Sequence, residues 1–254
     1  LLKELVAPGS SILVVGGDGL VDEVTKAGFT VTRSALDNPA AVVQGFSPEV
    51  GWVHLAEAAF ALNGDGTTGD LPWVATNTDW TIPQARGTAP GNGTLVSAVH
   101  TAVGRLPVVA GKPEVAIFEE AMTRFGTRDA LMIGDRLDTD ILGGNRAGFA
   151  TALVLTGVDT VRTALGAITD ERPDHLIADL TGLFAPEAEI AVEESDDSSI
   201  ARCGAAQATA HDDGLRISGD EDDLDAWRAA CAAWWARNPQ VDTASLPEIE
   251  WTAA

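Results

Sequence analysis

The chain has 254 residues, 45% of them hydrophobic, which is enough for one large domain or two ordinary ones with a sizeable core. Its formal net charge of −22 argues against nucleic acid or an anionic membrane as a partner, because contacts with phosphate groups need Lys and Arg side chains. The sequence contains no run of about 18 apolar residues and no signal-peptide pattern, so neither a membrane span nor a secretory leader is predicted.

The first half of the chain alternates short apolar runs with helix-spaced segments. Residues 11–15 (SILVV) are apolar and β-branched, as in a buried strand, and lead into a GGDG turn. That turn lacks the third glycine of a dinucleotide-binding GxGxxG, so a plain turn into a helix is favoured. Gly104 stands where a helix commonly ends in glycine. The predicted strands are 11–15, 30–35 and 71–76, and the predicted helices are 20–29, 54–62 and 93–104.

A second series of elements follows with the same alternation. Strands separated by helices predict a parallel sheet with helices on both faces, which is an α/β fold. The predicted strands are 108–110, 130–133, 150–156 and 176–178, and the predicted helices are 114–125 and 141–147.

The composition changes from about residue 189. Residues 199–218 predict two strands joined at an HDDG turn, and residues 224–237 predict a helix capped by Asp222 or Asp223. The pattern indicates a small ββα appendage, with the acidic clusters around it as solvated surface. An acyl-CoA-binding module of acetyltransferase type would need a Q/RxxGxG/A loop, which this segment lacks, so a structural or oligomeric role is favoured. The side chains expected on or near one face of the helix are Trp227, Cys231, Trp234 and Trp235.

An acidic motif, GDRLDTDI at residues 134–141, lies directly after a predicted strand and directly before a predicted helix. In an open parallel sheet, ligands bind beyond the carboxyl ends of the strands, so Asp135 is expected to face a cleft. Asp140 follows five residues later, near the helix start. Two carboxylates there suit Mg²⁺, which prefers carboxylate oxygens and keeps several waters. The alternative for Asp140 is that its side chain only caps the helix.

A basic motif, GKP at residues 111–113, follows another predicted strand and places Lys112 23 residues before Asp135. Gly111 allows a close backbone approach, and Pro113 suits the first turn of a helix. Lys112 is expected to face the same cleft and to neutralise charge on a carboxylate and a phosphate. A lone GKP is a weak signal, whereas GKP followed by a strand and GDxxxTD is a specific combination.

Together these motifs resemble the haloacid-dehalogenase (HAD) superfamily, and more narrowly its NagD-like branch with a large C2-type cap. The resemblance rests on GKPxxxxF, GDRLDTDILGGNRAG and VATNTD with GTAPGNGTLVSAV, and it covers roughly residues 12–180. It implies a partial, three-layer, Rossmann-like core with an α/β cap, and the appendage resembles one on actinobacterial glycerol-3-phosphate phosphatases of this branch. The implied domains are the cap at 1–107, the C-terminal half of the core at 108–188 and the ββα appendage at 189–254.

The resemblance also implies a reaction. The family hydrolyses phosphoesters: an aspartate attacks phosphorus, and water then hydrolyses the aspartyl phosphate. A second aspartate, two residues further on, acts as general acid and base, and Mg²⁺ offsets the charge repulsion. By this resemblance Lys112 steadies the nucleophile and the phosphoryl group. Asp135 is a Mg²⁺ ligand, and Asp140 supports the waters of the metal or orients the loop.

The segment NGDGT, which begins at Asn63, differs by one residue from the DxDGT nucleophile motif of this family. If Asp65 belonged to that motif, Thr76 would end the next core strand only 11 residues later. A parallel crossover needs about 10–12 residues for its connection alone, and the residues before Asn63 are helix-like, so a polar surface loop is predicted. No DxD follows a predicted strand ahead of Lys112. We therefore expect a truncated chain that lacks its nucleophile, is inactive as given and leaves an apolar sheet edge unpaired.

In capped members of this branch, the cap contacts the leaving group. Asn77, Asp79 and Trp80 follow a cap strand and are expected to bind substrate, with a buried, structural Trp80 as the alternative. Ile82 stands where some relatives that act on pyridoxal phosphate have a histidine, which argues weakly against that substrate. The predicted substrate is a small phosphometabolite of the glycerol 3-phosphate or 2-phosphoglycolate type. The second hypothesis is a non-catalytic HAD-like protein that binds a phosphate ligand or a partner.

The remaining expectations concern location and partners. Cys203 and Cys231 have no metal-binding spacing and predict two free thiols in a cytoplasmic protein. The expected ligands are Mg²⁺ and a small phosphorylated metabolite, without nucleic acid or membrane. A homodimer is left open.

Overall fold

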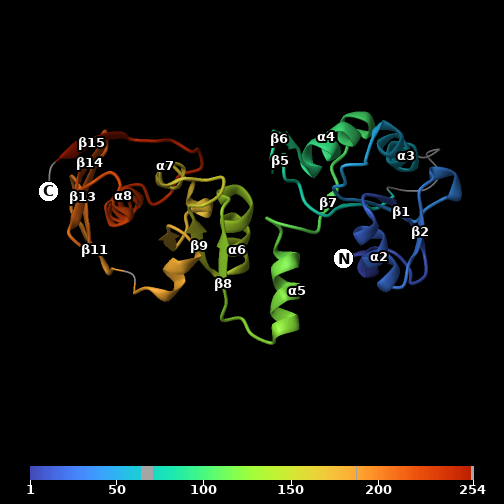
Figure 1. The fold of residues 1–254 in the computed structure, drawn as a ribbon, viewed down its shortest axis with the longest axis horizontal. Coiled ribbons are helices and arrows are strands. Elements are labelled where there is room, and N and C mark those ends of the chain that lie inside the picture. The colour runs from blue at the N-terminus through green and yellow to red at the C-terminus, as the bar shows by residue number, and fades with distance from the viewer. Residues whose placement is uncertain (64–70, 187, 253–254) are drawn as a thin grey trace. The chain divides into compact units, whose positions relative to one another are not determined.

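The computed structural model describes residues 1–63, 71–186 and 188–252 of the chain (Figure 1). The chain divides into two compact units, Leu1–Glu120 and Ala121–Ala254, and the division falls within helix α5 (Val115–Phe125). Among the described residues, no helix has the length and apolar character needed to cross a membrane.

Unit 1 is built around a five-stranded parallel sheet with the strand order β2-β1-β3-β4-β7, accompanied by a β5–β6 hairpin. Every strand and helix predicted for the first half of the chain is present within a few residues. The strands are β1 (Ser11–Val15), β2 (Thr30–Thr32), β3 (Ala41–Gln44), β4 (Trp73–Ala75), β5 (Thr81–Gln84), β6 (Gly87–Pro90) and β7 (Val108–Val109). The α-helices are α1 (Leu2–Leu5), α2 (Asp18–Lys26), α3 (Trp52–Asn63) and α4 (Asn92–Val103).

Helices cover both faces of the unit 1 sheet, which explains why its strands are almost continuously apolar. Leu13 belongs to a buried cluster with Val99 of α4, whereas its neighbour Val14 belongs to a second cluster with Val24 of α2. Successive side chains of one strand thus enter opposite layers. Gly104 ends α4 with a φ of 74°, in the left-handed region that favours glycine.

Unit 2 begins with a three-stranded parallel sheet of order β10-β9-β8. Here too the predicted strands and helices are present, although the first turn after β8 is a π-helical turn rather than α-helix. The strands are β8 (Leu131–Gly134), β9 (Ala150–Val154) and β10 (His175–Ile177), the π-helical turn is Leu137–Ile141, and the helices are α6 (Leu142–Ala147) and α7 (Val161–Leu165).

The C-terminal segment is larger than the predicted ββα appendage, so the prediction of two strands is wrong. A five-stranded sheet of order β11-β12-β13-β14-β15 packs against helix α8 (Leu224–Arg237), which Asp223 caps as predicted. An extra turn at Gly204 (φ 58°) divides the first predicted strand, and the glutamate-rich outer strands gave no alternating apolar signal. The strands are β11 (Ile190–Glu194), β12 (Ser199–Cys203), β13 (Ala206–His211), β14 (Gly214–Ser218) and β15 (Glu248–Thr252).

This five-stranded sheet and the three-stranded sheet share one hydrophobic core. Leu153 of β9 and Leu165 of α7 are fully buried in the same cluster as Ile217 of β14 and Trp227 of α8. Leu137, two residues after Asp135, belongs to this cluster as well. The C-terminal segment is therefore part of the packing of unit 2. The predicted boundaries at residues 107 and 188 stay predictions.

Of the NGDGT segment, the structure describes only the first residue, Asn63. Asn63 is the last residue of helix α3, and residues 64–70 lie outside the described part of the chain. A nucleophile motif of the DxDGT type follows a strand. The helix before Asn63 therefore supports the conclusion that the sequence similarity is accidental.

Candidate active site

Asp135 directly follows strand β8, as predicted. It begins the Asp135 loop (residues 135–137), which lies beside the Gly157 loop (residues 157–159) that follows the neighbouring parallel strand β9. The Val158 backbone N–H donates to Oδ2 of Asp135 at 3.0 Å. Within the described part of the chain, Oδ1 of Asp135 has no hydrogen-bond partner. One carboxylate oxygen is thus fixed by the protein and the other remains available to a ligand.

Two glycines permit this arrangement. A Cβ atom at Gly157 would lie 2.0 Å from Oδ2 of Asp135, and one at Gly134 would lie 2.1 Å from the Cβ of Asp140. Real Cβ atoms do not approach other atoms so closely, so both carboxylates occupy space that any other residue would fill.

Asp140 is buried and holds the Asp135 loop from the other side. Its Oδ2 accepts the backbone N–H groups of Asp135 and Arg136, both at 3.2 Å. Asp140 lies inside the π-helical turn, whereas Arg136 occupies the N-cap position. The geometry favours loop orientation over helix capping for this side chain.

The carboxylate oxygens of this site suit Mg²⁺ better than an ion that prefers sulfur or nitrogen ligands, or one whose ligands all come from the protein. Among the described residues, no three His, Cys, Asp or Glu side chains converge on one point. Mg²⁺ is usually held by one or two carboxylates while water completes its shell. Asp135, with one unengaged oxygen beside a second buried carboxylate, fits that pattern.

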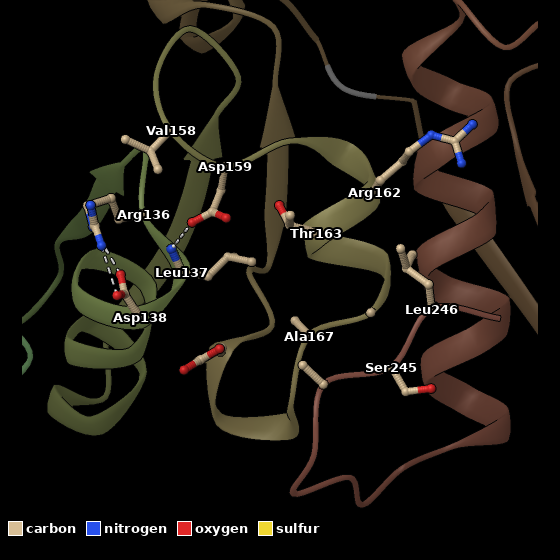
Figure 2. A pocket seen from close by; sticks show the side chains of 13 residues that line it. Arg136, Leu137, Asp138, Val158, Asp159, Arg162, Thr163, Ala167, Ser245 and Leu246 are labelled. Carbon is tan, nitrogen blue, oxygen red and sulfur yellow. Dashed lines mark hydrogen bonds and ion pairs between the residues drawn. The ribbon is translucent and has the colours of Figure 1, made fainter. Parts of the chain in front are cut away.

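A cavity of about 440 Å³ lies on the flank of the Asp135 loop (Figure 2). Leu137 and Asp138 line one side, and Ser245 and Leu246 from the C-terminal segment line another. Figure 2 shows Arg136 turned toward Asp138, with which it forms an ion pair at 2.9 Å. The cavity wall therefore combines the Asp135 loop with the segment that follows helix α8.

Three carboxylates, those of Asp138, Asp159 and Glu171, line this cavity together with Arg136 and Arg162. Partial burial raises the pKa of Glu171, and the neighbouring carboxylates of Asp138 and Asp159 raise it further.

Cys231 lies deep in the shared core, where burial raises its thiol pKa strongly. Cys203 is buried as well, and buried thiols are chemically inert, so neither free cysteine is a candidate nucleophile.

In unit 1, Lys112 lies at the edge of the sheet where the parallel strands end. A Cβ atom at Gly111 would lie 1.9 Å from the backbone oxygen of Thr76, so the GKP segment crosses directly over the end of β4. Lys112 and the predicted substrate residue Asn77 thus come from adjacent strand ends. The Lys112–Pro113 peptide bond is cis.

The loop that carries Asn77, Asp79 and Trp80 is fixed by the first turn of helix α4. Asn92 is buried and donates from its side chain to the Asn77 backbone oxygen at 2.7 Å, and the Gly93 N–H donates to the Asp79 oxygen at 2.8 Å. Trp80 is 58% exposed, so the alternative of a buried, structural tryptophan is wrong. The loop thus carries polar groups and one exposed aromatic ring, and hydrogen bonds hold its backbone to helix α4.

The predicted site residues fall into two groups. Lys112, Asn77, Asp79 and Trp80 belong to unit 1, and Asp135 and Asp140 belong to unit 2. The structure brings residues together within each group, and the convergence of Lys112 with Asp135 stays a prediction.

Sequence reasoning missed the Gly157 loop. Gly157 and Asp159 contact the Asp135 loop although they lie more than twenty residues further along the chain. The available signal was the position of TGVDT at the end of a predicted strand, because neighbouring parallel strands bring their carboxyl ends together.

Comparisons with known proteins agree with this fold. A family model described as HAD-hydrolase-like matches residues 109–183. D-glycerol 3-phosphate phosphatase of Mycobacterium tuberculosis is 41% identical over 236 residues, which cover 92% of this chain and 65% of that protein. Chronophin of Rattus norvegicus is 39% identical over 62% of this chain and 51% of its own length. The chain thus spans less than two thirds of the length of these curated relatives.

Solved structures give the same result. The glycerol phosphate phosphatase of M. tuberculosis in complex with magnesium superposes with a TM-score of 0.79 at 36% identity, covering 99% of this chain and 71% of that one. A p-nitrophenyl phosphatase from Archaeoglobus fulgidus superposes with a TM-score of 0.60 at 30% identity, covering 70% and 67%. The chain belongs to the HAD-like hydrolase family.

Proposed function

We propose that the protein is a Mg²⁺-dependent phosphomonoesterase that acts on a small phosphometabolite of the glycerol 3-phosphate type, with 2-phosphoglycolate as the nearest alternative. The observation that carries the proposal is Asp135, held by a neighbouring backbone N–H at the end of a parallel strand with one carboxylate oxygen unengaged. The similarity to glycerol phosphate phosphatases supports the substrate class.

Asp135 would hold the Mg²⁺ ion, and Asp140 would fix the loop that presents Asp135. The bound ion would offset the repulsion between the substrate phosphate and the carboxylates. Lys112 would place a positive charge beside the phosphoryl group, as lysines do in phosphate sites. Asn77 and Asp79 would bind the hydroxyl groups of the leaving alcohol, and the exposed ring of Trp80 would cover it.

We further propose that the attacking aspartate and the acid/base aspartate come from a segment outside these 254 residues. No DxD follows a strand ahead of Lys112, and the helix before Asn63 argues against NGDGT as a substitute. Strand β8 is at the edge of its described sheet, and Leu131 on it is 41% exposed. A further strand beside β8 would cover that apolar edge. A cytoplasmic location and a possible homodimer are also part of the proposal.

The test is hydrolysis of p-nitrophenyl phosphate, glycerol 3-phosphate and 2-phosphoglycolate by the 254-residue chain and by the longest in-frame product of its gene. We expect turnover only when a strand–DxDGT segment is present, and we expect that turnover to require Mg²⁺. The Asp135→Asn substitution should abolish it. Metal-independent turnover, or full activity of Asp135→Asn, would contradict the proposal.

The second candidate is a non-catalytic protein that binds a phosphate ligand, and the lack of a DxD ahead of Lys112 is the observation in its favour. It predicts saturable binding of phosphate without turnover by the longest in-frame product. The retained metal-site carboxylates argue against it, because a cation site without phosphate chemistry has little use.

A further inference from the structure

We propose that Asp159 is a positioning residue that holds the Asp135 loop in its cation-binding conformation. This inference rests on the proposed role of Asp135. Asp159 itself is not expected to touch the cation or the substrate.

Three hydrogen bonds join the Asp135 loop to the Gly157 loop. Val158 N–H donates to Asp135 Oδ2 at 3.0 Å, and Asp159 N–H donates to the Asp135 backbone oxygen at 2.9 Å. In the opposite direction, Leu137 N–H donates to Oδ2 of Asp159 at 2.8 Å (Figure 2). The donors and acceptors alternate between the loops, so each loop fixes the other. Of the three hydrogen bonds, only the one from Leu137 N–H uses a side chain of the Gly157 loop, the Asp159 carboxylate. A substitution of Asp159 can therefore remove this hydrogen bond.

The carboxylates of Asp159 and Asp140 together accept the backbone N–H groups of the Asp135 loop. Asp140 accepts the N–H groups of Asp135 and Arg136, and Asp159 accepts that of Leu137. Three consecutive N–H groups are thus satisfied by two carboxylates, and hydrogen bonds to an ionised acceptor are stronger than neutral ones. Without the Asp159 carboxylate, the Leu137 N–H loses its acceptor, and two of the three hydrogen bonds between the loops remain.

The alternative is that Asp159 serves only the start of helix α7. The contacts argue against it. Thr160 is the N-cap residue, and its side chain accepts from Thr163 N–H. The Asp159 carboxylate instead bonds to Leu137, and among the described residues it forms no ion pair with Lys or Arg. Its contacts point to the Asp135 loop.

The experiment compares Asp159→Ala and Asp159→Asn with a matched control, Asp179→Ala, in the 254-residue chain. Asp179 also accepts a backbone N–H, from Thr181 at 2.7 Å, at the start of a short helical turn in the same unit. The probe is Mn²⁺, which takes the same oxygen ligands as Mg²⁺ and broadens nearby NMR signals even when it binds weakly. The readouts are the Mn²⁺ concentration that half-broadens the amide signals of the Asp135 loop, the metal-free exchange rate of the Leu137 amide, and the melting temperature.

We expect Asp159→Ala to raise the half-broadening concentration about tenfold or more, as loss of an outer-shell partner does at metal sites. Exchange of the Leu137 amide should accelerate by roughly the same factor, because that amide loses its acceptor. Asp159→Asn keeps an oxygen acceptor and should fall between the wild type and Asp159→Ala. Asp179→Ala should leave both readouts within about twofold while it changes the melting temperature as much as Asp159→Ala does.

Two results would overturn the inference: unchanged readouts in Asp159→Ala, or equal effects of Asp159→Ala and Asp179→Ala. Failure of the proposed function gives a different result, namely no broadening of the Asp135 loop in the unsubstituted protein. The exchange rate of the Leu137 amide would then still show whether Asp159 holds the loop.

Discussion

Gly157→Ala tests whether the Asp135 loop depends on close packing against its neighbour. The added Cβ would lie 2.0 Å from Oδ2 and 2.4 Å from the Cβ of Asp135, so the two loops must separate. The φ angle of Gly157 is outside the left-handed region, so the penalty is steric rather than conformational. Overpacking of this kind costs about 1–3 kcal/mol.

At roughly 2–4 °C per kcal/mol for a chain of this size, the melting temperature should fall by about 2–12 °C. The separation also removes the Val158–Asp135 hydrogen bond, so Mn²⁺ affinity at the Asp135 loop should fall about tenfold. Differential scanning calorimetry and Mn²⁺ titration measure the two effects. Gly19→Ala is the matched control, because a Cβ there meets nothing within 4 Å. If Gly157→Ala melted and bound Mn²⁺ like the wild type, the packing argument would be refuted.

Three further predictions concern the rest of unit 2. Ile217→Ala should lower the free energy of unfolding by about 2–5 kcal/mol in a denaturant titration, because Ile217 is fully buried in the shared core; Ile190→Ala, at 38% exposure, should cost much less. Asp223→Ala should cost about 1 kcal/mol through loss of the α8 cap, seen as a lower denaturation midpoint without a change in slope. Glu171→Gln should raise the melting temperature at pH 7 and leave it unchanged near pH 4. The raised pKa of Glu171 means that the folded state binds its proton more tightly, so stability is lost as the pH rises above the ordinary value of 4.5. Equal pH profiles of the wild type and Glu171→Gln would contradict this last reasoning.

Local sequence signals predicted most of the α/β elements. The apolar run of β1 and the helical stripe of α4 with Gly104 are encoded within a few residues each, and both are confirmed. The same kind of local signal predicts Asp135 at the end of a strand, since an apolar run followed by Gly-Asp marks the end of β8.

The remaining features depend on contacts between distant segments. The bond between Leu137 and Asp159 arises only because β8 and β9 are parallel neighbours, and no local pattern encodes that pairing. The outer strands β11 and β15 are glutamate-rich because much of their surface faces water, so their apolar alternation is weak. The turn at Gly204 was missed because one glycine within an apolar stretch is compatible with a continuous strand.

The core that β9 shares with α8 has a consequence for synthesis. Leu153 emerges from the ribosome long before Trp227, and α8 is complete only about 60 residues after β10. At a synthesis rate of roughly 5–20 residues per second, the apolar side of the nascent three-stranded sheet stays exposed for several seconds before α8 can pack against it. During that interval the exposed apolar surface is a natural target for chaperones. A chain released before Arg237 is synthesised would keep this hydrophobic surface exposed.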